Sequence, residues 1–482
     1  MTDTTPTDPQ HAYQASGNGR RLRTWRPQSR GPNHGGSIDQ VVTRVRDLVR
    51  NNPWAGAAID RYVSNSIATG IQAKAVNGTP DEKAAVDDLH REWCLQADAD
   101  GVLTFEAMQA LASREWKEAG EVFVRIRVRR PEDGLAVPLQ LQMIESEQCP
   151  RSHYATATNG NTIREGIEVS PIGKRVAYWM YGAHPGDTFT GNIDATQLRR
   201  IPADQIIHLF RPLRAGQLRG VPDLAGVAAH AYNLDRINDS TIERVKVGNL
   251  FAGFLKRTKG GSDTVLGETQ VDTDTDDTPI AGLEPGTMVE LPDGVEPVFS
   301  DPPNAGSDYP QFMRFNLLAF AARVGVPYEV LTGDLANVSD RALKLILLEF
   351  HRLIEMDLWL YMIPQFCQRI RNAWWDAAVL AGALIAPDYA TRAGWYRETL
   401  WMPEGWPYSH PVQDVTADEK AIAAGLTSRT KLVLRRGEDP AEIDAEQAAD
   451  NARADALGLV YTSDGRIASG APAPMQVTTQ EP

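Results

Sequence analysis

Residues 214–222 read RAGQLRGVP, and from their last residue a long helical pattern runs to about residue 257. Apolar side chains recur there every three or four positions, the spacing of one face of an α-helix: Leu224, Val227, Ala228, Ala231, Leu234, Ile237, Ile242, Val245 and Phe251. The next segment differs sharply, because eleven acidic residues and no Lys or Arg lie between Gly260 and Gly306. A long helix that leads into an acidic insertion is therefore the feature around which the chain is organised.

Helical patterns also dominate the chain after the insertion. One covers residues 309–324, breaks at Val326-Pro327, and is followed by a very long helix that begins at Ser339. This helix carries its apolar side chains on one face: Leu343, Ile346, Leu347, Phe350, Ile354, Leu358, Tyr361, Phe366, Ile370 and Trp374. A Trp-rich segment comes next, then helical patterns at 416–424 and 429–435, an Ala-, Asp- and Glu-rich helix, and a polar tail.

The chain before residue 214 mixes helices with antiparallel strands. Residues 1–36 are polar and hold five arginines, which predict a flexible basic arm that contacts DNA or another protein, or is simply solvated. Ser37 and Thr79 can each cap a helix. Alternating apolar residues at 122–128 and 139–144, a hairpin around Gly173 and an apolar run at 205–210 predict strands. The predicted fold class is therefore α+β and helix-rich.

The composition excludes membrane and disulfide-rich classes of protein. Of the 482 residues, 42% are hydrophobic and 23% charged, and no stretch approaches the roughly 18 apolar residues of a membrane span. Cys94, Cys149 and Cys367 are too few and too far apart for a disulfide framework, so we expect reduced core residues. The net charge of −14 disfavours tight binding to a duplex, although an acidic protein can surround DNA without gripping it.

Sequence signatures of catalysis are missing. The chain has no phosphate-binding GxxxxGK[ST] loop, no GxSxG elbow and no HExxH helix. His208 lies in an apolar strand, where we expect a hydrogen-bonded core histidine. Asp272, Asp274 and Asp276 have the spacing of calcium-loop ligands, but Asp277 stands where that loop requires glycine. We therefore predict neither an enzyme nor a cofactor or metal site.

Several segments together resemble the lambda-type portal proteins of tailed bacteriophages. The stretch at 214–222 is the most specific of them. The other matching segments are RDLVRNNP at 46–53, Ala58-Ile59, Gly70-Ile71, EGIE at 165–168, AYW at 177–179, IPA at 201–203, IHLF at 207–210, GVP at 325–327, NVSDRA at 337–342, Trp401, Pro403, Trp406-Pro407, GLTS at 425–428 and GED at 437–439. The family more often has a Tyr and a second Ser after the Asn of the 337–342 segment. The order and spacing of the segments carry the resemblance, over roughly residues 40–460.

The resemblance implies a division of the chain into the regions of a portal subunit. These are a flexible basic arm (1–36), an α/β wing (37–221), a stem helix (222–257), an acidic clip (258–307), a second stem helix (308–325), a tunnel loop (326–340), a long helix with a Trp-rich wing segment (341–412), a helical crown (413–460) and a disordered tail (461–482). The implied function is that of a structural subunit, which forms a ring at one capsid vertex and serves as the conduit for DNA packaging and ejection.

The resemblance also implies partners and a location. We expect a homo-oligomeric ring, a dodecamer, that binds the terminase large subunit, a head-to-tail adaptor, and the major capsid or scaffold protein. Double-stranded DNA passes through its channel without sequence specificity, and no membrane is involved. The protein is expected at the portal vertex of the virion, and in the host cytoplasm during assembly.

Three sets of residues are candidates for these contacts. Leu331, Asp334, Asn337 and Ser339 are the candidates for groups near DNA in the tunnel loop, with an ordinary interhelical connection as the alternative. Asp272, Asp274, Asp276 and Asp277 are the candidates for motor docking, although the acidity could instead keep the unassembled ring soluble. Arg214, Gln217 and Arg219 are assigned to the stem junction or a subunit contact, or else to local capping interactions.

Two other functions compete with the portal hypothesis. A phage DNA-processing enzyme such as a nuclease requires clustered carboxylates on rigid strands or a phosphate loop, and the sequence shows neither. Another head-to-tail structural protein, such as an adaptor, is typically much shorter and lacks this order of helix, acidic insertion, helix, loop and long helix. The portal hypothesis is therefore preferred.

Overall fold

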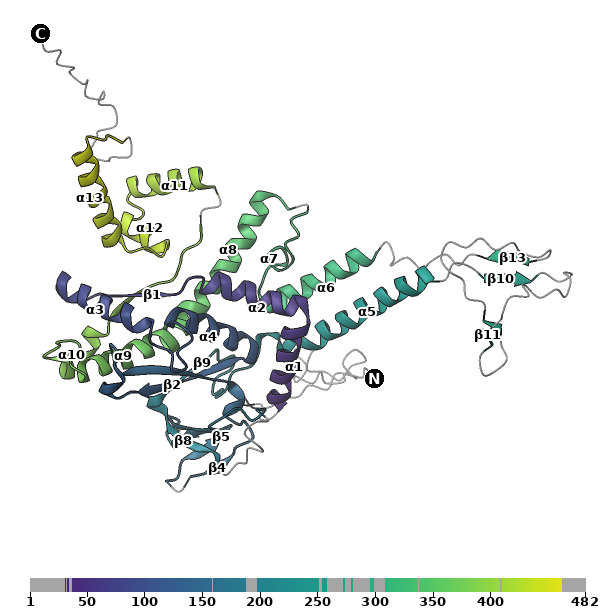
Figure 1. Ribbon diagram of the computed structural model, residues 1–482, viewed down its shortest axis with the longest axis horizontal. Helices are drawn as coiled ribbons and strands as arrows, with labels where there is room; N and C mark the ends of the chain where they lie inside the picture. The colour runs from purple at the N-terminus through teal and green to yellow at the C-terminus, as the bar shows by residue number, and fades with distance from the viewer. Residues whose placement is uncertain are drawn as a thin grey trace, which may run out of the picture.

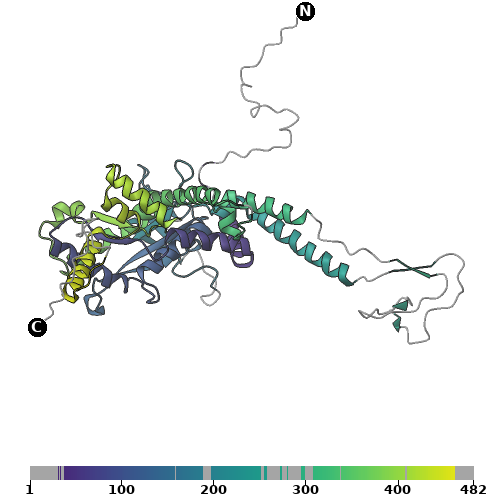
Figure 2. The ribbon, with the colours of Figure 1, turned by 90° about the horizontal axis from the view of Figure 1, so that it is seen from above.

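A body of helices and sheets carries two long projecting helices in this computed structural model (Figures 1 and 2). α5 (Ala228–Leu250) and α6 (Tyr309–Val324) leave the body side by side. The hydroxyl of Tyr309 joins them by donating to Oδ1 of Asn238 at 2.7 Å. The structure describes residues 31, 33, 37–157, 159–187, 197–250, 254–257, 272–273, 279–280, 295–298, 308–336, 338–407 and 410–461.

Four helices with well-defined starts open the body. They are α1 (Ser37–Asn51), α2 (Pro53–Ser66), α3 (Pro80–Cys94) and α4 (Phe105–Ala119). Asn52 caps α2 by accepting from two backbone N–H groups, and Thr79 and Glu82 form the predicted capping box of α3. Thr104 caps α4 in the same way. The capping box predicted at Thr79 is confirmed, and α1 begins at Ser37 itself.

Two antiparallel sheets lie below these helices in Figure 1. The first has the order β3-β2-β9, from β2 (Glu121–Val128), β3 (Leu139–Ile144) and β9 (Ile206–Phe210). The second runs in sequence order through β4 (Ala155–Thr156), β5 (Thr162–Arg164), β6 (Ile167–Val169), β7 (Arg175–Met180) and β8 (Arg199–Pro202). The β6–β7 pair is the hairpin expected around Gly173. The α+β, helix-rich fold class is confirmed.

The alternation of β2 divides the buried side chains into two cores. Val122 and Val124 face the helices and join the main core, which extends to the helices after the insertion. Phe123 faces the second sheet and packs against Tyr178 and His208. The first sheet is therefore the middle layer of the body.

The long helical stretch after residue 339 is less regular than predicted. It consists of α8 (Asp340–Asp357), a π-helix η9 (Leu358–Cys367) and α9 (Gln368–Leu380). Pro364 lies inside η9, where its missing N–H and fixed ring disrupt a regular α-helix. Phe350, Ile354 and Phe366 are buried as expected. The prediction of one uninterrupted α-helix is wrong.

The helix that follows residue 222 is also shorter than predicted. A single 3-10 turn, η8 (Asp223–Gly226), precedes α5, which ends at Leu250. Residues 254–257 form strand β10 (Phe254–Arg257), antiparallel to β13 (Val295–Val298), so the prediction of a helix up to residue 257 is wrong there. Strands β11 (Asp272–Thr273) and β12 (Pro279–Ile280) pair with each other.

The last part of the chain returns to the body and then leaves it. After α10 (Tyr389–Tyr396), strand β14 (Thr399–Met402) pairs with β1 (Gln72–Ala75). α11 (Pro411–Ala423), α12 (Arg429–Arg435) and α13 (Pro440–Leu457) then form a separate group above the body in Figure 1. The three cysteines are buried and free, as predicted. Among the described residues, no helix combines the length and apolar character needed to cross a membrane.

Candidate functional site

Two segments of backbone cross in close contact just before α5, one at Gly120 and the other at Gly220. Gly120 ends α4 with a φ of 87°, and a Cβ built on it would lie 2.3 Å from the carbonyl carbon of Val221. A Cβ on Gly220 would lie 1.9 Å from the carbonyl oxygen of Gly120. Backbone cannot yield at such distances, so both positions require glycine. This crossing explains the second glycine of the 214–222 stretch.

The crossing places Glu121 at the centre of a buried charged group, here called the Glu121 cluster. Its carboxylate accepts hydrogen bonds from Nη2 of Arg151 and from Nη2 of Arg219, each at 2.6 Å. The Ser146 hydroxyl at 2.6 Å, Nε2 of His208 at 3.0 Å and the Gly220 N–H at 2.8 Å complete its contacts. Because every lone pair of the carboxylate can be occupied, the charge is stable without water.

The charges of the cluster explain its protonation states. Burial alone would raise the pKa of Glu121, but Arg151 and Arg219 hold it well below its ordinary value. Burial lowers the pKa of His208 to about 3, although Glu121 opposes this shift. Arg175 donates to Nδ1 of His208 at 2.8 Å, so the ring proton is on Nε2. His208 is therefore the neutral, hydrogen-bonded core histidine that the sequence predicted.

A second buried charged group, the Asp357 cluster, lies at the end of α8. The Asp357 carboxylate accepts from Nζ of Lys117 at 2.6 Å and from the Tyr62 hydroxyl at 2.8 Å. Lys117 also donates to Asp223 at 3.0 Å, and Arg211 donates to Asp223 at 2.8 Å. Burial and the adjacent Asp357 raise the pKa of Tyr62 well above its usual value. Asp223 belongs to η8, so the cluster fixes the start of the projecting helices to α2, α4 and α8.

The three residues proposed for the stem junction differ in their surroundings. Arg219 is 3% exposed, and besides Glu121 it donates to the carbonyls of Cys149 and Glu165 at 2.8 and 2.7 Å. Gln217 closes the 213–219 loop by accepting from the N–H of Leu213 and donating to the carbonyl of Arg219. Arg214 is exposed and donates to the carbonyl of Gly31. Local interactions thus describe Gln217 and Arg219 within the chain; a subunit contact through this loop stays a prediction.

The loop between α6 and α8 contains a short helix. Gly325 ends α6 with a φ of 81°, and α7 (Tyr328–Thr332) follows, ended by Gly333. The Asp334 carboxylate accepts from the Tyr328 hydroxyl at 3.1 Å and from the Ala336 N–H at 3.0 Å. These two hydrogen bonds lower the pKa of Asp334, which keeps the loop negatively charged.

The loop candidates divide into exposed and buried residues. Asp334 lies in the loop, and Ser339 is exposed and caps α8 through the Ala342 N–H. Leu331 is 4% exposed and packs in the main core, so the expectation that its side chain lies near DNA is corrected. The exposed leucine of this loop is Leu335, at 54%. Asn337 lies outside the described residues.

The candidates for motor docking are mostly outside the described part of the chain. Asp272 belongs to strand β11, opposite Ile280. Asp274, Asp276 and Asp277 are not among the described residues. Their proposed role stays a prediction.

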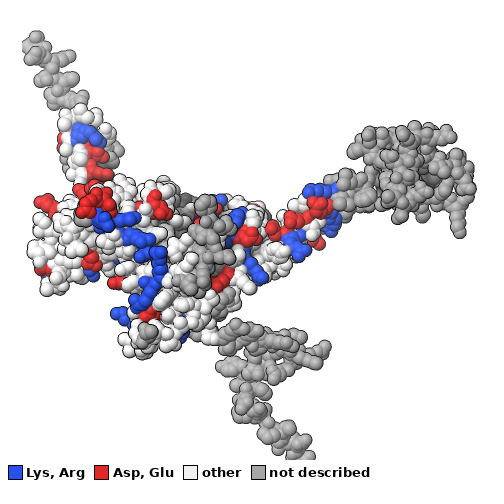
Figure 3. All heavy atoms as spheres, turned by 60° about the horizontal axis from the view of Figure 1, so that its bottom comes forward, with Lys and Arg blue, Asp and Glu red and all other residues white. Residues whose placement is uncertain are grey.

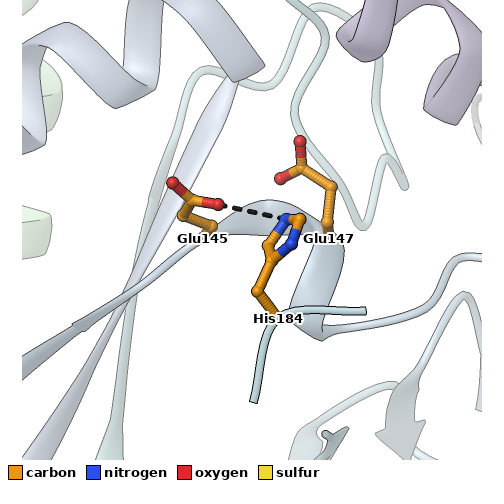
Figure 4. A group of neighbouring side chains, drawn as sticks. All are labelled: Glu145, Glu147 and His184. Atoms are coloured by element: carbon orange, nitrogen blue, oxygen red, sulfur yellow. Dashed lines mark ion pairs between the residues drawn. The ribbon is translucent and has the colours of Figure 1, made fainter. Parts of the chain in front are cut away.

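A group of possible metal ligands lies beside the Glu121 cluster, at Glu145, Glu147 and His184 (Figure 4). Nε2 of His184 lies 3.1 Å from the Glu145 carboxylate, and its Nδ1 accepts from the Gly186 N–H. Both oxygens of Glu147 accept from Arg46, at 2.7 and 3.1 Å. Because the Arg46 guanidinium already pairs with Glu147 and both ring nitrogens of His184 have partners, we describe this group as a network of ion pairs and hydrogen bonds.

The comparison with protein families decides the identity of this fold. The family model described as "Phage portal protein, lambda family" matches residues 18–357 of the chain. The chain belongs to the lambda family of phage portal proteins. The resemblance found in the sequence is confirmed. Portal proteins are structural components of the phage capsid, and the function is that of a portal protein and not of an enzyme.

Portal proteins of two phages are similar in sequence to this chain over most of its length. It is 26% identical to the probable portal protein of Halomonas phage phiHAP-1 over 456 residues, which cover 89% of this chain and 85% of the relative. It is 22% identical to portal protein B of Escherichia phage lambda, covering 92% of this chain and 90% of that protein. A solved structure of the neck of a native gene transfer agent particle is 12% identical, with a TM-score of 0.49 and coverage of 83% and 94% of the two chains.

Sequence reasoning missed the partners of the two charged clusters. Glu121, Arg151 and Asp357 were not singled out, although Glu121 and Asp357 are charged residues beside apolar runs. That position is a usable signal, because a charge inside an apolar element needs a partner. The sequence pattern does not identify the partner, because Glu121 and Arg219 are 98 positions apart.

Proposed function

We propose that twelve copies of this chain form the ring at one vertex of the phage capsid, through which DNA is packaged and ejected. The observation that carries the proposal is the pair of projecting helices α5 and α6, fixed at its base by the Asp357 cluster. A hairpin held this firmly can pack against neighbouring copies around a common axis. Family membership gives the portal function; the ring geometry and the number of copies are the proposal.

The described elements have assignable roles in such a ring. The body up to residue 221, with α8 to β14, is the wing; α5 and α6 are the stem; and the 326–340 segment is the tunnel loop. The insertion between the stem helices is the clip, and α11 to α13 are the crown. This division keeps the predicted regions and changes the limits of the helices within them.

The dimensions of a helical stem suit the passage of a duplex. Twelve helices, each about 10 Å across, enclose a bore of roughly 25 to 30 Å. The net charge of −14 per chain disfavours strong phosphate contacts, which would hold the strand still. Asp334, Leu335, Asn337 and Ser339 are the groups we assign to the inner surface of the loop. Repulsion between Asp334 and the DNA phosphates supports sliding of the duplex rather than its binding.

The acidic insertion is the proposed docking site for the assembly's partners. Its eleven carboxylates suit basic surfaces on the terminase large subunit during packaging, and on a head-to-tail adaptor afterwards. The wing is the part that we assign to the major capsid or scaffold protein. We also propose that the ring assembles in the host cytoplasm.

The ring is tested by the mass and shape of the purified protein. Light scattering should give about 640 kDa, twelve times the 53.0 kDa chain, and negative-stain micrographs should show rings with a central hole. A chain that stays at 53.0 kDa across salt and protein concentration would contradict the proposal.

A further inference from the structure

A band of arginines crosses the face of the body on which β2 and β8 lie, here called the arginine band (Arg125, Arg127, Arg129 and Arg199). Figure 3 shows Lys and Arg side chains gathered along this lower face. Arg125 and Arg127 lie on β2, and Arg129 directly follows the strand. Alternate residues of a strand share a face and stand about 7 Å apart, so these three form a line. Arg199 of β8 lies close enough to Arg125 for charge repulsion.

The described part of the chain supplies no carboxylate partner for the arginine band. Within the described residues, none of its four arginines makes an ion pair, whereas the neighbouring Arg200 is held by Glu168 at 2.7 Å. Arg127 and Arg129 donate instead to the side-chain oxygens of Gln142 and Gln140, at 2.9 and 2.8 Å. A neutral amide orients a guanidinium group and leaves its positive charge available.

Arg125 gives a second, independent reason to expect an anion at the band. Its Nε is shielded from solvent and has no hydrogen-bond partner among the residues that the structure describes. Burial lowers the pKa of Arg125, and the charges of Arg127 and Arg199 lower it further. Like charges this close are unfavourable unless an anion lies between them.

We propose that the arginine band binds the phosphate backbone of double-stranded DNA, on a face of the body away from the tunnel loop (Figure 1). This inference rests on the proposed function, because DNA is the polyanion that a portal ring meets. Guanidinium groups form forked hydrogen bonds with phosphate oxygens. DNA interfaces are polar and basic, whereas protein interfaces have apolar or aromatic anchors. The band is flanked by Gln140 and Gln142, which favours DNA over an acidic protein.

The test measures DNA binding by intact rings. A fluorescent 30-base-pair duplex of random sequence is titrated with wild-type rings, with the triple variant Arg125→Gln, Arg127→Gln, Arg199→Gln, and with a control. The control, Arg91→Gln, Arg392→Gln, Arg453→Gln, removes the same charge from exposed arginines that have carboxylate partners. The triple variant should bind about tenfold more weakly or worse, and the slope of log affinity against log salt should fall by about 0.9 per arginine lost. The control should change affinity less than twofold.

Other outcomes overturn the inference. Equal losses in both variants would mean that only net charge matters. Displacement of DNA by polyglutamate at equal charge concentration would favour an acidic protein partner. Loss of the ring mass in the triple variant with unchanged circular dichroism would make the band a subunit contact. If the triple variant does not fold, the exposed Arg199→Glu alone should weaken binding at least threefold; unchanged binding would count against the band. Ring mass is measured on every sample, so a failure of the ring is distinguishable from a failure of DNA binding.

Discussion

Arg219 and Glu121 meet in the interior of the body, with Nη2 of the arginine 2.6 Å from Oε1 of the glutamate. Neither side chain is accessible enough to use water as a substitute partner. Removal of Arg219 therefore leaves the buried Glu121 carboxylate only partly compensated, by Arg151, and breaking a buried ion pair typically costs about 3–5 kcal/mol. The stretch before α5 is held to β2 by this pair, so its loss should also loosen the base of the projecting helices.

The substitution Arg219→Met should destabilise the protein. It should lower the free energy of unfolding by about 3–5 kcal/mol, since Glu121 keeps only part of its hydrogen bonds. Denaturant unfolding followed by circular dichroism measures the change. The matched control is Arg429→Met, whose partner Asp444 is exposed, and it should cost less than about 1 kcal/mol. Similar losses in the two variants would contradict the buried-charge argument.

Gly220→Ala should be at least as damaging, for a steric reason. The added Cβ would lie 1.9 Å from the Gly120 carbonyl oxygen, so the two backbone segments would have to move apart. We expect a loss of about 3 kcal/mol or more, or no soluble protein. Gly182→Ala is the control, because a Cβ there meets no atom within 4 Å and its φ is not left-handed. A folded Gly220→Ala protein with wild-type stability would refute the crossing.

The stability of the body should fall in acid through Glu168. Hydrogen bonds from Arg200 and from Asn161 and Asn159 outweigh burial and lower the pKa of Glu168 from 4.5 to about 2. A carboxylate with a lowered folded-state pKa contributes stability that is full above pH 4.5 and is lost as the pH falls toward 2. Glu168→Gln should therefore destabilise the protein at neutral pH and flatten its loss of stability between pH 4.5 and 2. Thermal midpoints across this range check the slope; parallel curves for the two proteins would contradict it.

Charge reversal in the insertion should separate docking from ring formation. Lysines at Asp272, Asp274, Asp276 and Asp277 should weaken binding of the terminase large subunit by at least tenfold and leave the ring mass unchanged. Binding is measured by pull-down or interferometry at two salt concentrations. Four reversals at exposed acidic residues elsewhere serve as the control: Glu92, Asp100, Glu132 and Glu419. Unchanged docking would favour the alternative, in which the acidity only keeps the ring soluble.

The sequence predicted the elements of this fold better than their connections. Capping residues such as Thr79, and periodicities of two and 3.6, depend on neighbours in sequence and were read correctly. The helix predicted up to residue 257 was wrong because β10 is fixed by pairing with β13, forty residues away. Leu331 was assigned to a DNA-facing loop, yet its burial depends on the packing of α7 against the core. Tertiary contacts decided both cases.

The candidate site was predictable only in outline. Arg219 and Gly220 were noticed because of their motif, but the role of each depends on a residue about one hundred positions earlier. The arginines of β2 lie between the alternating apolar residues at 122–128 that predicted the strand. Whether they have carboxylate partners is a property of the folded neighbourhood, and Gln140 and Gln142 are where an acidic residue would have neutralised them.

The pairing of β1 with β14 has a consequence for biosynthesis. Ala75 lies opposite Thr399, so β1 can pair only after β14 has left the ribosome, more than three hundred residues later. Tyr62 likewise meets its partner only when Asp357 has been made. A nascent chain that stops before residue 357 lacks the Asp357 partner of Lys117 and Tyr62, and one that stops before residue 399 lacks the partner of β1. Contacts of such long range form slowly. Synthesis must therefore pass residue 402 before β1 can pair, and we expect products truncated before that point to fold incompletely and to be excluded from assembly.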